Sequence, residues 1–186
     1  IITENWLEEM LQLCQQKDVG MVGAKLYYPD DTIQHAGVVV GLGGVAAHVL
    51  CKLPRDAEGY MGRLRCVQEI SAVTAACMMV KTSVFKAVGG FDEELKVAFN
   101  DIDLCMKVRK YGVKIVFTPY AELYHYESKS RGMEDTPEKQ LRFSREVNCF
   151  RRKWERELLK GDPYYNPNLT LNNTDCSLRK QEKNGD

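Results

Sequence analysis

Apolar and polar positions along the chain change between helical and extended spacing, which predicts helices and strands in turn. In residues 5–16 the apolar side chains recur every three or four positions, so we expect a helix that Thr3 caps. Residues 19–28 and 36–44 are apolar runs separated by the turn signal "PDDT". They predict two strands.

The same alternation continues to the end of the chain. Residues 51–64 have the composition of a loop, and residues 67–82 form an extended apolar run with many small side chains. Paired glycines predict the end of a short helix within 83–95. The later segments predict a helix over 100–112, strands over 114–119 and 121–128, a helix over 137–160, and a turn-rich tail over 161–186.

Two aspartates stand close together at the start of the helix predicted over 100–112. Asn100 is a favoured N-cap residue, and Gly112 is a typical helix end. At about 100° per residue, Asp101 and Asp103 point in different directions. Asp103 lies on the side of Lys107, so a favourable charge at the helix N-terminus and an ion pair four residues apart explain it.

Asp101 has no such structural explanation. It shares its side of the helix with Leu104, Cys105 and Val108, and an unpaired buried carboxylate is costly. It therefore lies at the edge of a cleft or has a buried partner. A carboxylate beside apolar residues at a cleft is a candidate general base, while a second capping acid or a surface ion pair remain alternatives.

Composition narrows the class of protein. A chain of 186 residues most simply forms one domain, and its 26 basic and 26 acidic residues cancel, which argues against a nucleic-acid partner. No apolar run reaches the ~20 residues of a membrane span, and the first residues lack the layout of a signal peptide. The seven cysteines are scattered without a C-x-x-C pair, which suits reduced thiols. We expect a cytoplasmic protein, with peripheral attachment to the inner face of the membrane left open.

Five segments, taken together and in order, carry a resemblance to a known family. The segments are "VGMVGAKLYYPDDTIQHAGVV", "EISAVTAACMMVKTSVFKAVGGFDEEL", "FNDIDLCMKVRKYG", "TPYAELYHYESKSRG" and "DPYYNPNLTL". With them the chain resembles the C-terminal half of bacterial family 2 glycosyltransferases, which implies an α/β GT-A fold with a mixed sheet and flanking helices. Residues 1–160 would form the acceptor and catalytic-base half, followed by the tail at 161–186. The family moves sugars from nucleotide-diphosphate donors to surface polysaccharides such as O-antigen.

The resemblance also implies roles for individual residues. "NDID" matches the family's Glu-Asp motif, whose second acid deprotonates the acceptor hydroxyl in a displacement with inversion, and that position is Asp101. Asn100 stands where the family has the first acid. By the same resemblance, the residues expected to bind the acceptor are Asn100, Asp92, Glu93 and His35, and those expected to close over the donor diphosphate are Lys129, Ser130 and Arg131, for which a solvated basic turn is the alternative.

His125 stands where the family has a histidine ligand of a divalent cation, Mg²⁺ or Mn²⁺. A lone histidine at a strand end is more often structural, and Glu127 is placed to be its partner. His48 is interpreted as a core or rim residue. By the same resemblance, the family's Asp-x-Asp metal motif stands shortly before the helix that here begins at Thr3, so it is not among these residues. The resemblance therefore implies an inactive fragment that lacks the nucleotide-binding half.

Two other classes of function remain as alternatives. A glycosyltransferase-like module could bind a carbohydrate or a partner enzyme without catalysis. An unrelated α/β hydrolase has less support, because the sequence contains no G-x-S-x-G motif and no glycine-rich phosphate loop. The fragment interpretation also predicts that residues 19–26 expose an unpaired strand edge, and that the chain forms a homodimer or higher oligomer.

Overall fold

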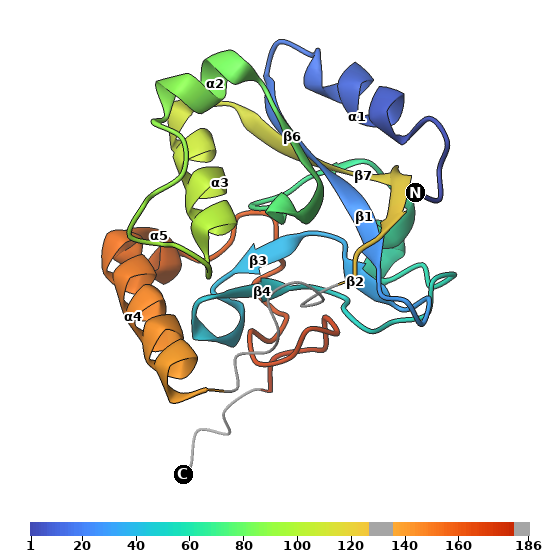
Figure 1. Cartoon of the computed structure of the whole chain (residues 1–186). Helices are drawn as coiled ribbons and strands as arrows, with labels where there is room; N and C mark the ends of the chain where they lie inside the picture. The colour runs from blue at the N-terminus through green and yellow to red at the C-terminus, as the bar shows by residue number, and fades with distance from the viewer. Residues whose placement is uncertain (127–135, 181–186) are drawn as a thin grey trace.

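A mixed β-sheet forms the centre of the molecule. The computed structural model describes residues 1–126 and 136–180. Its main sheet has the strand order β2-β1-β7-β5, with β6 also paired to β1, and β3 pairs with β4 in a second small sheet (Figure 1). The mixed α/β class is as predicted. The strands are β1 (Val19–Tyr27), β2 (Ile33–His35), β3 (Val38–Val40), β4 (Ala46–His48), β5 (Gln68–Glu69), β6 (Met78–Val80) and β7 (Lys114–Tyr124).

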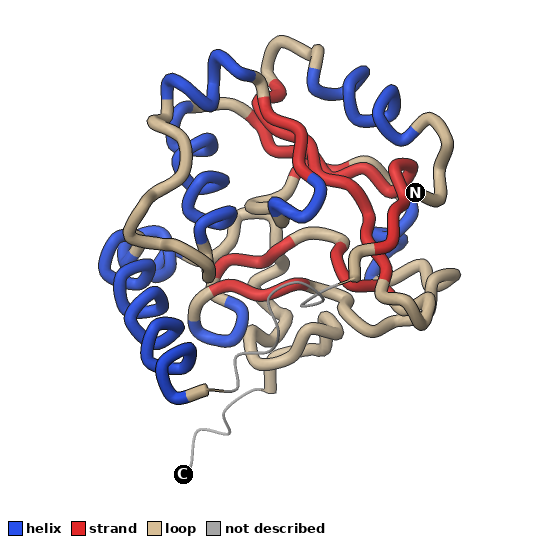
Figure 2. Tube along the Cα trace, in the orientation of Figure 1, coloured by secondary structure: helices blue, strands red, loops and turns tan. Residues whose placement is uncertain are grey.

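Helices flank this sheet on both sides (Figure 2). α1 packs on the side of β1 that carries Val22 and Leu26, in one apolar cluster. α3 packs on the other side, where the Cys105 thiol lies 3.5 Å from the Met21 sulfur. The helices are α1 (Trp6–Cys14), α2 (Thr82–Ala87), α3 (Asn100–Tyr111), α4 (Pro137–Lys153) and α5 (Glu155–Lys160), with short 3-10 turns η1 (Leu42–Gly44), η2 (Tyr60–Arg65) and η3 (Ala75–Cys77).

β1 is the central strand and is buried along its whole length. It is antiparallel to β2 and β6 on one edge and parallel to β7 on the other. Burial on both faces explains why its sequence is a continuous apolar run. The prediction that residues 19–26 expose an unpaired edge is wrong, because both edges have partners. Oligomer formation stays a prediction, without this edge to support it.

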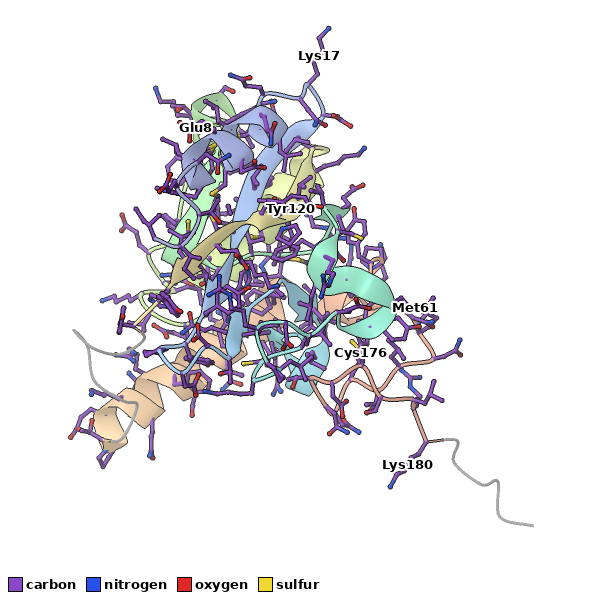
Figure 3. The ribbon with its side chains drawn as sticks, turned by 90° about the vertical axis from the view of Figure 1, so that its right-hand side faces the viewer. Glu8, Lys17, Met61, Tyr120, Cys176 and Lys180 are labelled. Atoms are coloured by element: carbon purple, nitrogen blue, oxygen red, sulfur yellow. The ribbon has the colours of Figure 1, made fainter. Side chains whose placement is uncertain are left out.

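Two local predictions near the N-terminus and β7 are also wrong. Asn5, not Thr3, stands at the N-cap of α1, and the Thr3 hydroxyl instead accepts the Glu122 N–H. The strands predicted over 114–119 and 121–128 are not separate within the described residues, since β7 is continuous from Lys114 to Tyr124. Its pairing register with β1 shifts around Pro119, which has no N–H to offer. The resulting bulge leaves the Tyr120 side chain exposed (Figure 3).

The C-terminal third wraps against the domain. The helix predicted over 137–160 is two helices, which break at the buried Trp154. In the tail, the Asp162 carboxylate accepts the Val40 N–H at 2.8 Å and the Ser71 hydroxyl at 2.6 Å. Lys180, at the end of the described tail, points away from the molecule (Figure 3). No helix in the described parts of the chain combines the length and apolar character that a membrane crossing needs.

Candidate functional site

The first turn of α3 is set by the residue that precedes it. Phe99 has a left-handed backbone (φ 62°) and stands at the N-cap, so the prediction that Asn100 is the cap is wrong by one residue. The Phe99 carbonyl accepts the Asp103 N–H at 2.8 Å. Its ring packs against Phe143 and Phe150, with centroids 5.9 and 5.3 Å away. This packing offsets the strain of a bulky residue in the left-handed region.

Two backbone N–H groups hold the Asp101 carboxylate. Ala75 donates to Oδ2 at 3.1 Å, and Ile102 donates to Oδ1 at 2.9 Å. Asp101 is only half-buried, and each carboxylate oxygen keeps a further lone pair. The carboxylate is thus oriented and still able to accept a proton. The predicted apolar side of α3 is confirmed, since Leu104, Cys105 and Val108 are fully buried.

Asp103 is structural and far more buried than a capping acid. It is 0% exposed, and its Oδ1 accepts the Trp154 indole N–H at 2.8 Å and lies 2.7 Å from the Lys153 ammonium. Lys107, the predicted partner, is confirmed at 3.3 Å from Oδ2. Burial alone would lower the Lys153 pKa, but hydrogen bonds to Asp103 and Asp92 outweigh it and raise that pKa. Asp103 therefore fastens α3 to the α4–α5 junction.

Asp92 and Glu93, the predicted acceptor-binding acids, lie on the turn after α2. Asp92 pairs with the Lys153 ammonium at 2.5 Å and accepts the Glu94 N–H at 3.0 Å. These two hydrogen bonds lower the Asp92 pKa. Glu93 is exposed. Lys153 pairs with both Asp92 and Asp103, so Asp92 takes part in the contacts that hold α3 in place. Of the two predicted acids, Glu93 is the one whose side chain is exposed to a ligand.

His35, the third predicted acceptor residue, is fully buried. Its Nδ1 lies 3.0 Å from Nδ1 of His48, and its Nε2 accepts the Thr74 N–H at 3.4 Å. Burial, reinforced by the His48 charge, holds the pKa of His35 well below its usual range. Both ring nitrogens are engaged by the protein, which leaves neither of them for a hydrogen bond to a saccharide hydroxyl. We therefore expect His35 to act on the Thr74 loop.

His125 follows β7 and is fastened by Gln34, a residue that the sequence did not single out. The His125 Nδ1 lies 2.7 Å from Gln34 Oε1, and Gln34 Nε2 donates to the His125 carbonyl at 3.1 Å. Because a carbonyl only accepts, the second bond sets the amide orientation, and Nδ1 must then carry the proton. The lone pair is left on Nε2, as a metal ligand requires. A polar residue inside a buried strand was the available signal for Gln34.

The described residues do not by themselves form a metal site. No group of three or more His, Cys, Asp or Glu side chains gathers among them in a way that could hold a metal ion. Mg²⁺ and Mn²⁺ prefer several oxygen ligands, and one imidazole is insufficient. Glu127, the predicted partner of His125, and Lys129, Ser130 and Arg131, which were predicted to contact the donor diphosphate, lie outside the described residues.

A hollow of about 630 Å³ lies at the other end of α3. Its walls include Arg109, Trp154 and Tyr164, and Asp101 is not among them. The 12 residues of α3 separate its two ends by ~18 Å. Asp101, whose carboxylate accepts the Ala75 N–H of η3, therefore lies away from this hollow, at the N-terminal end of α3.

The family follows from the sequence profile that the chain matches. The profile of the "Glycosyltransferase like family 2" covers residues 1–146. The chain belongs to this family. The curled mixed sheet with flanking helices is accordingly the architecture of a GT-A family 2 domain.

The similar proteins are much longer than this chain. It is 57% identical over 96% of its length to the uncharacterized protein y4gI of Sinorhizobium fredii, and 38% identical over 100% of its length to the O-antigen biosynthesis protein RfbC of Myxococcus xanthus. A third of the chain (33%) is 36% identical to an N-acetylglucosaminyl-diphospho-decaprenol L-rhamnosyltransferase of Mycobacterium tuberculosis. The chain spans 20%, 14% and 20% of the length of these three relatives.

Proposed function

We propose that this chain supplies the catalytic base and the acceptor side of an inverting glycosyltransferase. The enzyme moves a sugar from a nucleotide-diphosphate donor to a saccharide acceptor during synthesis of a surface polysaccharide of the O-antigen type. The observation that carries the proposal is the half-buried Asp101 carboxylate at the start of α3, with both oxygens oriented by backbone N–H groups. Membership of family 2 and the similarity to RfbC support it.

The reaction needs one proton transfer at Asp101. A free lone pair of the carboxylate takes the proton of the acceptor hydroxyl as that oxygen attacks the anomeric carbon. The bond from this carbon to the diphosphate oxygen breaks on the opposite side, so the configuration inverts. A positioned general base contributes ~10²–10⁴-fold to such a step.

The remaining parts of the proposed site surround this carboxylate. Asn100, in the first turn of α3, and the exposed Glu93 are the described residues proposed to bind acceptor hydroxyls. The Lys129, Ser130 and Arg131 segment is proposed to contact the donor diphosphate. When bound, Mg²⁺ or Mn²⁺ would neutralise the leaving diphosphate, and Nε2 of His125 is the described group available to it. Other ligands must come from beyond the described residues, so we expect the chain alone to be inactive.

The decisive variant is Asp101→Asn in an active protein that contains this chain. A base acts in the transition state, so turnover should fall at least ~10²-fold while donor affinity stays nearly unchanged. The matched control is Asp18→Asn, which alters an exposed acid directly before the first residue of β1 and should leave turnover unchanged. Near-normal turnover in Asp101→Asn would contradict the proposal.

A non-catalytic carbohydrate-binding module is the second candidate, favoured by the lack of a metal cluster among the described residues. It predicts that a longer protein with this chain binds a saccharide but transfers no sugar, and that Asp101→Asn does not change binding.

Calorimetry of the chain with a nucleotide diphosphate and Mn²⁺, beside light scattering, tests the fragment interpretation. Tight binding by a monomer would argue against it.

A further inference from the structure

The loop that leads into η3 connects Asp101 to a buried histidine. The Ala75 N–H donates to Asp101 Oδ2 at 3.1 Å, and the preceding N–H, that of Thr74, donates to Nε2 of His35 at 3.4 Å. The Thr74 hydroxyl accepts the Ala76 N–H at 3.4 Å and closes the turn. Two consecutive peptide groups are thus fixed, one by the proposed base and one by the imidazole.

The geometry determines which form of His35 is present. A backbone N–H only donates, so the His35 Nε2 that faces Thr74 must be unprotonated, and the proton of the neutral ring lies on Nδ1. Nδ1–H then donates to Nδ1 of His48, 3.0 Å away on β4. The rings meet edge to face, at 82° with centroids 4.9 Å apart. His48 therefore selects the tautomer of His35 that can hold the loop.

A second attachment keeps the same segment against α3. The Cys105 sulfur, one turn after Asp101, accepts the Val73 N–H at 3.4 Å. Both Cys105 and Val73 are fully buried. The chain from Val73 to Ala75 is therefore held by α3 at its two ends and by His35 between them. Loss of the His35 acceptor would free the Thr74 peptide, and with it the orientation of the neighbouring Ala75 N–H.

We propose that His35 is a positioning residue for the proposed base: through the Thr74–Ala75 peptides it fixes the Asp101 carboxylate, and His48 fixes its tautomer. The inference rests on the proposed role of Asp101. A misplaced catalytic group can cost on the order of 10²-fold in rate. Removal of His35 should therefore lower the turnover number more than it changes the KM for the acceptor.

The test compares three variants in an active protein that contains this chain. His35→Leu keeps the bulk but removes both ring nitrogens, and turnover should fall ~10-fold or more. His35→Gln restores an acceptor that reaches the Thr74 N–H, and should recover most of the rate. The control Val19→Ala loses buried methyl groups at the first residue of β1, which pairs with Lys114 of β7, and should keep the wild-type turnover. A rate unchanged in His35→Leu overturns the proposal, as does an equal loss in His35→Gln and His35→Leu.

A double variant separates this proposal from the assignment of the base. If His35 acts only through Asp101, then His35→Leu with Asp101→Asn should be no slower than Asp101→Asn alone. If the turnover losses of the two single variants multiply in the double variant, the positioning role of His35 is overturned, while Asp101 remains the base. Normal turnover of Asp101→Asn overturns both proposals.

Nitrogen-detected NMR of the histidine rings tests the geometry on this chain without activity. We expect His35 to be protonated at Nδ1 and unprotonated at Nε2, and His48 to be unprotonated at Nδ1. A proton on Nε2 of His35 overturns the proposal, because that nitrogen could then not accept from Thr74. The same spectra, with thermal unfolding, show whether each variant is folded.

Discussion

Asp103→Asn should destabilise the protein considerably without removing a catalytic group. The substitution keeps the shape of the side chain and the acceptor for the Trp154 indole. It leaves the ammonium groups of Lys153 and Lys107, now 2.7 and 3.3 Å from a carboxylate, beside a neutral amide. A hydrogen bond to a charged group contributes ~1.5–3 kcal/mol, and breaking a fully buried ion pair costs ~3–5 kcal/mol.

The expected loss of stability in Asp103→Asn is smaller than the ~3–5 kcal/mol of a fully buried ion pair. Lys153 keeps Asp92 as a partner, and its side chain is 33% exposed, so part of its charge remains compensated. We therefore expect the free energy of unfolding to fall by ~2–3 kcal/mol, and the unfolding temperature to fall by roughly 5–10 °C for a chain of this size.

The assay is urea and thermal unfolding followed by circular dichroism, with Asp101→Asn as the control. Asp101 is half-buried, and within the described part of the chain its carboxylate accepts hydrogen bonds from the backbone N–H groups of Ala75 and Ile102, so its substitution should cost less than ~1 kcal/mol. A loss below ~0.5 kcal/mol in Asp103→Asn would refute the assignment of Asp103 as the buried link between α3 and the α4–α5 junction. So would equal losses in the two variants.

Two further predictions concern pH and the histidine at the end of β7. The Asp92 pKa is lowered in the folded state, so its contribution to stability is present above the unfolded pKa of 3.8 and is lost as pH falls through the folded pKa. Asp92→Asn should therefore reduce the fall in the free energy of unfolding at acidic pH, as measured by unfolding titrations at several pH values. An unchanged fall would contradict the role of the Lys153 pair. Gln34→Leu should release the His125 ring, so NMR should report mixed tautomers, and an active protein should need ~10–100-fold more divalent cation. A single unchanged tautomer would show that Gln34 does not fix the ring.

The parts of the fold that follow from local patterns could be predicted from the sequence. The helix over 100–112, its end at Gly112 and the opposite directions of Asp101 and Asp103 all depend on periodicity and capping chemistry within one segment. The continuous apolar run of β1 indicated a buried strand, but apolar spacing does not say which strands lie on its edges.

The features that were missed depend on residues far apart in the chain. The burial of Asp103 depends on Lys153, 50 positions later, and the orientation of His125 depends on Gln34, 91 positions earlier. Lys153 has no local signal that identifies it, and the polar character of Gln34 does not say that His125 is its partner. The left-handed Phe99 was missed for the same reason, since only packing against α4 makes that conformation tolerable.

The contact between Phe99 and α4 has a consequence for how the turn at Asp101 opens. The left-handed residue directly before Asn100 is held by rings from a helix that carries none of the proposed chemistry. The backbone over 99–101 should therefore not fluctuate open by itself. Its slow hydrogen exchange should be governed by undocking of α4, so that amides of the two segments exchange as one cooperative unit, with one common opening free energy.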